Sequence, residues 1–159
     1  MRRLVLVIAI GLVVAACGGG DDSSDGGSDP TGANGTSSDQ PDPCTLAGDT
    51  VLAGYFGGDV PEIERSQSGP IAGCSWRTDT ADSLLIQVAT DFDLHRPDPC
   101  RGCVDLSFGD DGYASESLLQ SSATFVDGNS WYSVSTTGFG DDAASITALA
   151  ETIFQNATN

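Results

Sequence analysis

The stretch Ala123-Thr-Phe-Val-Asp-Gly-Asn-Ser-Trp-Tyr-Ser-Val134 decides the fold. Two runs rich in β-branched and aromatic residues flank the sequence Asp127-Gly128-Asn129. Asp-Gly suits the positive φ angles that tight hairpin turns require. The stretch therefore predicts a β-hairpin.

Two further strands are predicted upstream of this hairpin. Residues 71–77 place Cys74 and Trp76 two positions apart, so both side chains point to one side of a strand. Residues 84–90 alternate in the same way, with Leu84, Ile86 and Val88 on one face and Leu85, Gln87 and Ala89 on the other. The polar stretch 78–83 joins these two strands as a second hairpin.

The remaining β region is less regular. Residues 61–70, which begin and end with proline, are predicted to be a loop. Residues 92–112 are predicted to be an irregular middle segment with a Gly-Asp-Asp-Gly turn at 109–112. Strand character resumes at 113–118.

Helices are predicted at both ends of this β region. The first spans 49–56, with Asp49 as its N-cap and Gly57-Gly58 as its stop signal. The second spans 141–156 and begins with two aspartates. Its apolar residues form one stripe at i, i+3, i+4, i+7 and i+8: Ile146, Leu149, Ala150, Ile153 and Phe154. The order of elements predicts an α+β fold in two layers, an antiparallel sheet covered by the N-terminal and the C-terminal helix.

The composition excludes one class of partner. The chain has 159 residues, with 23 Asp or Glu against six cations, all of them arginine, and a net charge of −17. Residues 44–159 hold 17 acids and four arginines, a net charge of −13. A nucleic-acid binder needs a basic surface, so nucleic acid is not an expected partner.

The N-terminus carries the pattern of an export signal. Arg2 and Arg3 precede an uncharged apolar run, Leu4–Ala16, that is too short for a membrane span of about 20 residues. The sequence Val14-Ala15-Ala16-Cys17 resembles the lipobox of bacterial lipoproteins. That resemblance implies that residues 1–16 are a removed signal peptide and that Cys17 carries a lipid anchor on the outer face of the cell membrane.

A spacer follows the predicted lipidation site. Residues 18–43 contain six Asp, no cation and no Leu, Ile, Val or aromatic residue. Such a segment buries too little apolar surface to offset its ordering entropy. Residues 17–43 are therefore predicted to be a lipidated cysteine with a disordered acidic tether, and residues 44–159 a single domain.

Four short motifs in the domain resemble a family of actinobacterial lipoproteins catalogued as a domain of unknown function. They are Asp42-Pro43-Cys44 before the first helix, Cys74-Ser75-Trp76, the Gly109-Asp110-Asp111-Gly112-Tyr113 turn and the closing helix from Ser145 to Phe154. The resemblance implies an envelope location and a disulfide between Cys44 and Cys74. It implies no activity.

Four cysteines remain if Cys17 is lipidated, and four allow three pairings. With the pairing that the resemblance implies, Cys100 would pair with Cys103. The Cys100-Arg-Gly-Cys103 spacing also permits a thiol–disulfide oxidoreductase. Such an enzyme needs its first cysteine at a helix N-terminus, and here Pro97 and Pro99 precede it. A structural disulfide is the favoured interpretation.

No catalytic or cofactor set is evident. His95 is the only histidine and is expected to be a solvated loop residue. The 109–112 segment lacks the alternating oxygen ligands of a calcium loop, the cysteines do not form two zinc-binding pairs, and a phosphate loop would need a lysine. Trp76, Trp131 and Tyr132 are expected in the core. No metal or cofactor is predicted.

The sequence thus predicts a lipid-anchored envelope protein that is not an enzyme. Its domain is expected to bind an envelope protein, a glycan or a small ligand. Two alternatives stay open: a thiol–disulfide oxidoreductase using Cys100 and Cys103, and a passive acidic surface protein of a salt-adapted cell.

Overall fold

One antiparallel sheet organises the chain. The computed structural model describes residues 40–98, 100 and 102–159. The elements in chain order are α1 (Asp49–Phe56), β1 (Ile63–Ser68), β2 (Ile71–Arg77), β3 (Ser83–Thr90), β4 (Val104–Asp105), β5 (Asp111–Glu116), β6 (Gln120–Asp127), β7 (Ser130–Thr137) and α2 (Ala143–Thr158).

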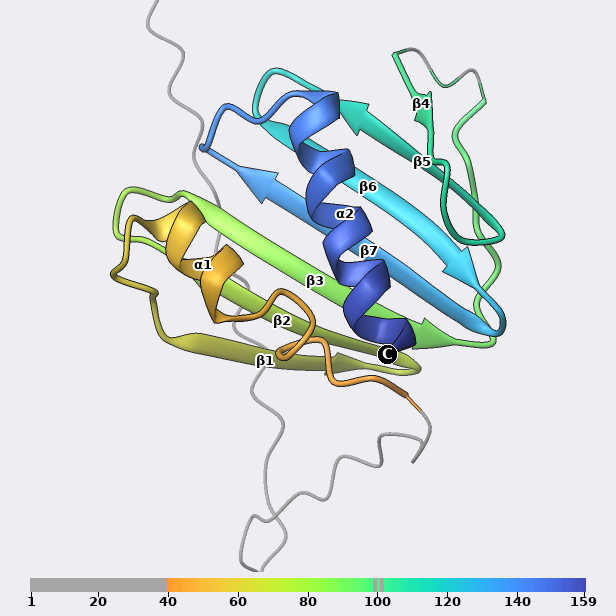
Figure 1. Cartoon of the computed structure of the whole chain (residues 1–159), viewed down its shortest axis with the longest axis horizontal. Helices are drawn as coiled ribbons and strands as arrows, with labels where there is room; N and C mark the ends of the chain where they lie inside the picture. The colour runs from red at the N-terminus through yellow and green to blue at the C-terminus, as the bar shows by residue number, and fades with distance from the viewer. Residues whose placement is uncertain (1–39, 99, 101) are drawn as a thin grey trace, which may run out of the picture. The chain divides into compact units, whose positions relative to one another are not determined.

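The strands pair in the order β1-β2-β3-β7-β6-β5-β4, and every neighbouring pair is antiparallel (Figure 1). Two meanders, β1 to β3 and β4 to β7, therefore meet at the β3–β7 pair. The predicted α+β class is confirmed as a seven-stranded antiparallel sheet with two helices.

The hairpin predicted within residues 123–134 is β6–β7. Its turn lies between the paired residues Asp127 and Ser130, and Gly128 takes the left-handed conformation with φ 57°. Phe125 pairs with Tyr132, and their rings stack with centroids 4.8 Å apart. The strand β6 begins three residues before the predicted stretch 123–134, and β7 ends three residues after it.

The predicted loop at 61–70 is wrong, because β1 occupies Ile63–Ser68. Every β1 residue except Gln67 is exposed, so the strand has no alternation of polar and apolar residues to reveal it. It forms through backbone pairing with β2, which runs from Ile63 opposite Trp76 to Ser68 opposite Ile71.

The middle of the chain also differs from the prediction. The short strand β4 lies inside the segment expected to be irregular, and β5 begins at Asp111, inside the predicted 109–112 turn. Gly112 is a strand residue whose added Cβ would lie 2.8 Å from Phe125 Cβ and 2.9 Å from the Thr124 carbonyl oxygen. Glycine is therefore needed there for close packing of β5 on β6.

Burial alternates along the central strands and defines two faces. We call the side with fully covered side chains the buried face. It carries the core residues Cys74, Trp76, Leu84, Ile86, Val88, Ala114, Ala123, Phe125, Tyr132 and Val134. The alternate residues of β2, β3, β7, β6 and β5 form the other side, which we call the open face. Ala89 lies on this side and is nevertheless completely buried.

Helix α2 packs on the sheet next to β5, β6 and β7 (Figure 1). The predicted stripe is confirmed for Ile146, Leu149, Ala150 and Ile153, which are buried, and Phe154 is half-buried against the same core. Ser121 ties the start of the helix to the sheet by donating a 2.5 Å hydrogen bond to the Asp141 carbonyl.

Helix α1 has the bounds that the sequence predicts, but its N-cap is Gly48 rather than Asp49, and no side chain caps it. Leu52 is its buried residue, with Val51, Tyr55 and Phe56 partly covered by the core. Asn156 of α2 donates a 2.7 Å hydrogen bond to the Leu46 carbonyl just before α1.

The described chain begins before Cys44. The Gln40 amide donates hydrogen bonds to the carbonyls of Val88, at 2.6 Å, and Pro70, at 3.3 Å. Arg65 on β1 forms a 2.9 Å ion pair with Asp42, and this hydrogen bond holds the pKa of the Asp42 carboxyl below its ordinary value. Residues 40–43 thus make contacts with the domain.

The N-cap of α2 gives a pH-dependent prediction. Asp142 accepts hydrogen bonds from the Ser145 amide and hydroxyl, both at 2.8 Å, and these bonds lower the pKa of Asp142 below its ordinary value of 3.8. A lowered pKa in the folded state stabilises the fold above pH 3.8, and this contribution is lost as the pH falls through the folded-state pKa. Asp142→Ala is expected to lower the melting temperature at pH 7 by about 3–5 °C.

Asp142→Asn provides the control, because an uncharged amide oxygen caps the helix at every pH. Melting curves from pH 7 to pH 2.5 should bring the wild type and the alanine variant together at the acid end. A constant difference between them at all pH values would contradict the carboxylate cap.

Candidate functional site

Four of the five cysteines lie in the described residues, in two disulfides. Cys44 pairs with Cys74 over a separation of 30 residues, with a Cα–Cα distance of 5.1 Å. Cys100 pairs with Cys103, three residues away, with a Cα–Cα distance of 5.6 Å. These are the two pairs favoured from the sequence. Cys17, the predicted lipidation site, lies outside the described residues, as do residues 1–16 and most of the predicted tether.

The Cys44–Cys74 disulfide is part of the core. Cys74 is completely buried in the middle of β2, and Cys44 is 8% exposed. The bond therefore fixes the segment that leads into α1 to the centre of the first meander. Its position assigns it a structural role.

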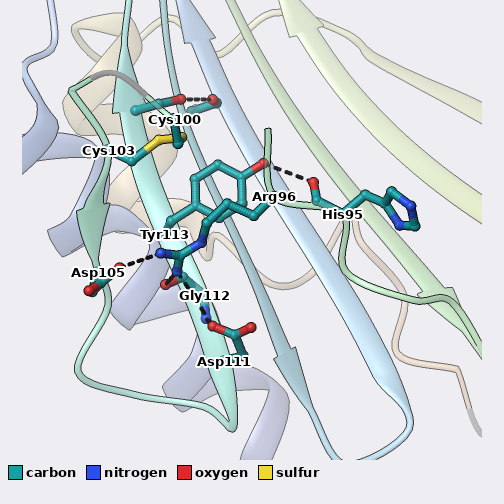
Figure 2. Close-up of a disulfide and its surroundings, with 10 residues drawn as sticks. His95, Arg96, Cys100, Cys103, Asp105, Asp111, Gly112 and Tyr113 are labelled. Atoms are coloured by element: carbon teal, nitrogen blue, oxygen red, sulfur yellow. Dashed lines mark hydrogen bonds and ion pairs between the residues drawn. A yellow bond between two sulfur atoms is a disulfide. The ribbon is translucent and has the colours of Figure 1, made fainter. Parts of the chain in front are cut away.

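The Cys100–Cys103 disulfide lies in the segment between β3 and β4 (Figure 2). The element that follows it is the two-residue strand β4, not a helix. A reactive thiolate in a Cys-x-x-Cys motif is stabilised by a helix N-terminus, and the described residues place neither cysteine at one.

Arg96 anchors this segment to β4 and β5. Its guanidinium donates to Asp105 at 2.6 Å and to the Gly112 carbonyl at 3.0 Å, and lies 3.5 Å from the Asp111 carboxylate. It also sits 5.2 Å from the centroid of the Tyr113 ring (Figure 2). Asp105 and Asp111 thus pair with the charge of Arg96. These contacts hold the segment around Arg96 against β4 and β5.

His95 is not brought into a catalytic arrangement. Its side chain is exposed, and Figure 2 shows the imidazole pointing away from the disulfide and from Arg96. The backbone carbonyl of His95 accepts a 3.4 Å hydrogen bond from the Tyr113 hydroxyl. Within the described part of the chain, the His95 imidazole forms no hydrogen bond to a hydroxyl or a carboxylate.

One hollow of the surface combines aromatic and acidic groups. Tyr55, Phe139 and Asp141 line it, and the rings of Tyr55 and Phe139 meet edge to face with centroids 5.2 Å apart. Burial, together with the Asp141 carboxylate, raises the pKa of Tyr55 to about 12. The phenol therefore stays protonated at neutral pH and offers no nucleophile.

The open face of the sheet is mainly polar. The strand registers align its side chains in three rows across the sheet. The first row is Ser75, Leu85, Ser135, Ser122 and Ser115. The second is Gly73, Gln87, Ser133, Thr124 and Tyr113. The third is Ile71, Ala89, Trp131, Val126 and Asp111.

Some polar side chains of this face pair with each other, and others make no hydrogen bond within the described residues. The hydroxyls of Ser115 and Ser122 hydrogen-bond to each other at 3.0 Å, and Thr124 donates to Ser133 at 3.4 Å. Within the described part of the chain the side chains of three further residues make no hydrogen bond: Ser75, Gln87 and Ser135. Their donors and acceptors are available to water or to a ligand.

Trp131 does not lie where the sequence predicts. Trp76 and Tyr132 are in the core, at 0% and 4% exposure, but Trp131 points to the open face and is half-buried against Phe92, with ring centroids 5.1 Å apart. Residues 131 and 132 are neighbours on one strand, so they must face opposite sides of the sheet. The alternation of side chains along a strand could have predicted that Trp131 faces away from the core if Tyr132 faces it.

The fold and these sites define a small, disulfide-bonded α+β domain with an extended polar sheet face. Comparison of the chain with family models, with curated proteins and with solved structures found no match. No helix in the described residues is long and apolar enough to cross a membrane.

Proposed function

We propose that the protein is a lipid-anchored binding protein of the bacterial cell envelope, with no catalytic activity, and that the open face is its ligand-binding surface. The observation that carries this proposal is the mainly polar open face, on which the side chains of Ser75, Gln87 and Ser135 make no hydrogen bond within the described residues. These side chains are only half-buried, so their donors and acceptors are accessible to a ligand.

The sequence supports the location. Cys17 follows a lipobox-like sequence and an apolar run, and residues 18–39 would hold the domain away from the membrane. Disulfides are stable in oxidising compartments, which agrees with an extracytoplasmic domain. We propose that the chain is exported, cleaved before Cys17 and held by its lipid on the outer face of the membrane, as in the actinobacterial lipoproteins that it resembles.

We further propose a two-layer architecture, in which α1 and α2 together form one layer on the buried face. Leu52 of α1 and Ile146 of α2 belong to the same buried cluster as Trp76 and Phe125 of the sheet, which supports this arrangement. It leaves the part of the open face around Ser75, Gln87 and Ser135 accessible, while Phe92 packs on Trp131 and Arg96 lies over Tyr113.

The anchor and the absence of thiol chemistry are tested together on protein from the membrane fraction. Alkylation followed by intact mass is expected to show a chain that begins at Cys17, carries a lipid mass and has no alkylated thiol. Reduction before alkylation should add four labels, because Cys44, Cys74, Cys100 and Cys103 are then free.

Cys17→Ala is the control variant, and it should carry neither the lipid mass nor the cleavage before residue 17. Two labels at Cys100 and Cys103 without reduction would contradict the binding proposal and favour the oxidoreductase alternative. A chain without lipid would contradict the anchor.

A further inference from the structure

A hollow of about 390 Å³ lies beside helix α1, within the size range of small-molecule sites. Val51, Gly54 and Tyr55 of α1 contribute part of its lining. Phe139 and Asp141 contribute the rest, from the connection between β7 and α2 (Figure 1). None of these residues belongs to a strand, so the hollow is separate from the open face.

Aromatic rings gather at this hollow. The Phe139 ring meets Tyr55 and Phe56 edge to face, with centroids 5.2 and 5.3 Å away. All three rings are half-buried, unlike the completely buried core residues Trp76 and Phe125. Part of each ring is therefore accessible, and the negative face of an aromatic ring attracts a cation within about 6 Å of its centroid.

The Asp141 carboxylate adds a full negative charge. Its Oδ2 atom is buried and makes no hydrogen bond within the described residues. Asp141 also takes no part in the ion pairs found there, which are made by Arg65 and Arg96. A covered carboxylate oxygen without a partner costs free energy, so a positive charge in the hollow would be stabilised. The residue as a whole is partly exposed, which lets a ligand approach it.

The end of α1 contributes in the same direction. Gly54 and Tyr55 belong to the last turn of this helix, which ends at Phe56. The C-terminal end of a helix carries a partial negative charge, and a cation near it is stabilised. No basic residue stands in this last turn to supply that cation.

This lining suits an organic cation better than a metal ion. A calcium or magnesium ion needs about six oxygen ligands, and the hollow offers a single carboxylate. The described residues contain no group of three His, Cys, Asp or Glu that could hold a metal ion. A substituted ammonium ion instead presents its methyl or methylene groups to the rings and its charge to the carboxylate.

We infer that the hollow formed by α1, Phe139 and Asp141 binds a small organic ammonium ion. Asp141 supplies the opposite charge, and the rings of Tyr55 and Phe139 pack against the carbon substituents of the nitrogen. The site is a second one, because it shares no residue with the open face.

Equilibrium dialysis tests the inference on the full chain, solubilised in a non-ionic detergent in about 0.15 M NaCl to screen diffuse charge attraction. The probes are choline, benzyltrimethylammonium and dimethylbutanol, a neutral isostere in which a carbon atom replaces the choline nitrogen. NMR quantifies each probe on both sides of the membrane. Both ammonium ions are expected to bind with a dissociation constant of about 1 mM or below, and dimethylbutanol at least about tenfold more weakly.

Two substitutions locate the site. Asp141→Asn is expected to weaken binding of both ammonium probes about tenfold, and Phe139→Leu about threefold, because leucine keeps an apolar side chain without the ring. Asp93→Asn removes the same charge from an exposed position between β3 and β4, and Phe92→Leu replaces an aromatic residue that is 40% exposed. These two controls should bind as the wild type does, and melting curves verify that each variant is folded.

Four results would overturn the inference. They are no binding of either ammonium probe, equal binding of dimethylbutanol, unchanged binding by folded Asp141→Asn, and an equal loss in Asp93→Asn, which would assign the binding to overall charge. None of these results alters the lipid and thiol measurements, so the anchored, non-catalytic function fails or stands separately.

Discussion

Replacing Cys44 and Cys74 together by alanine is expected to lower the free energy of unfolding by about 3–4 kcal/mol. The disulfide closes a loop with a sequence separation of 30 residues, and opening it returns that conformational freedom to the unfolded chain. Alanine is preferred to serine because Cys74 is completely buried and a hydroxyl there would lack a partner. Urea unfolding followed by tryptophan fluorescence measures the change.

The Cys100→Ala/Cys103→Ala variant is the matched control. Its cysteines are separated by only three positions, so the same loop relation gives about 2 kcal/mol or less. Equal losses from the two double variants would contradict the core role assigned to the Cys44–Cys74 bond.

Phe125→Ala is expected to cost about 3–5 kcal/mol, as is usual when a large buried aromatic residue is truncated. Phe125 is completely buried. Its ring stacks on Tyr132 and contacts Phe108 and Phe154, with centroids 5.4 and 6.0 Å away. The substitution therefore removes contacts with β7, α2 and the 107–110 turn at once. Urea unfolding measures the change in the free energy of unfolding.

Leu119→Ala serves as the control, because Leu119 is 80% exposed in the turn between β5 and β6. Its free energy of unfolding should stay within about 0.5 kcal/mol of the wild type. If Phe125→Ala destabilised the protein by less than about 1.5 kcal/mol, the described packing around Phe125 would be wrong.

The sequence predicts those elements that carry a turn signal or a regular pattern of polar and apolar side chains. The β6–β7 hairpin has a turn signal, and α2 has an apolar stripe that is confirmed in the buried Ile146, Leu149 and Ile153. The strand β1 has neither signal, because all its residues except Gln67 are exposed and it joins the sheet through its backbone. Edge strands of this kind leave no periodic pattern in a sequence.

The surface proposed to bind the ligand could be predicted only in part. Alternation in 84–90 separates Gln87 from the core, yet serine and threonine are abundant throughout the chain, so no single hydroxyl stands out. The rows that they form across the sheet depend on the pairing of β3 with β7, whose residues are separated by at least 40 positions. No local pattern encodes such a register.

The β3–β7 pairing also determines when the sheet can be completed during synthesis of the chain. Each meander is built from neighbours in the sequence, but β3 lacks its second neighbour until Ser130–Thr137 has been made. At about 5–20 residues per second, the 40 residues from Thr90 to Ser130 take roughly 2–8 s to synthesise. During that interval the strand containing Leu84, Ile86 and Val88 has an unpaired edge, the kind of surface that seeds aggregation. Nascent chains that stop before residue 130 should therefore be the species most in need of a chaperone.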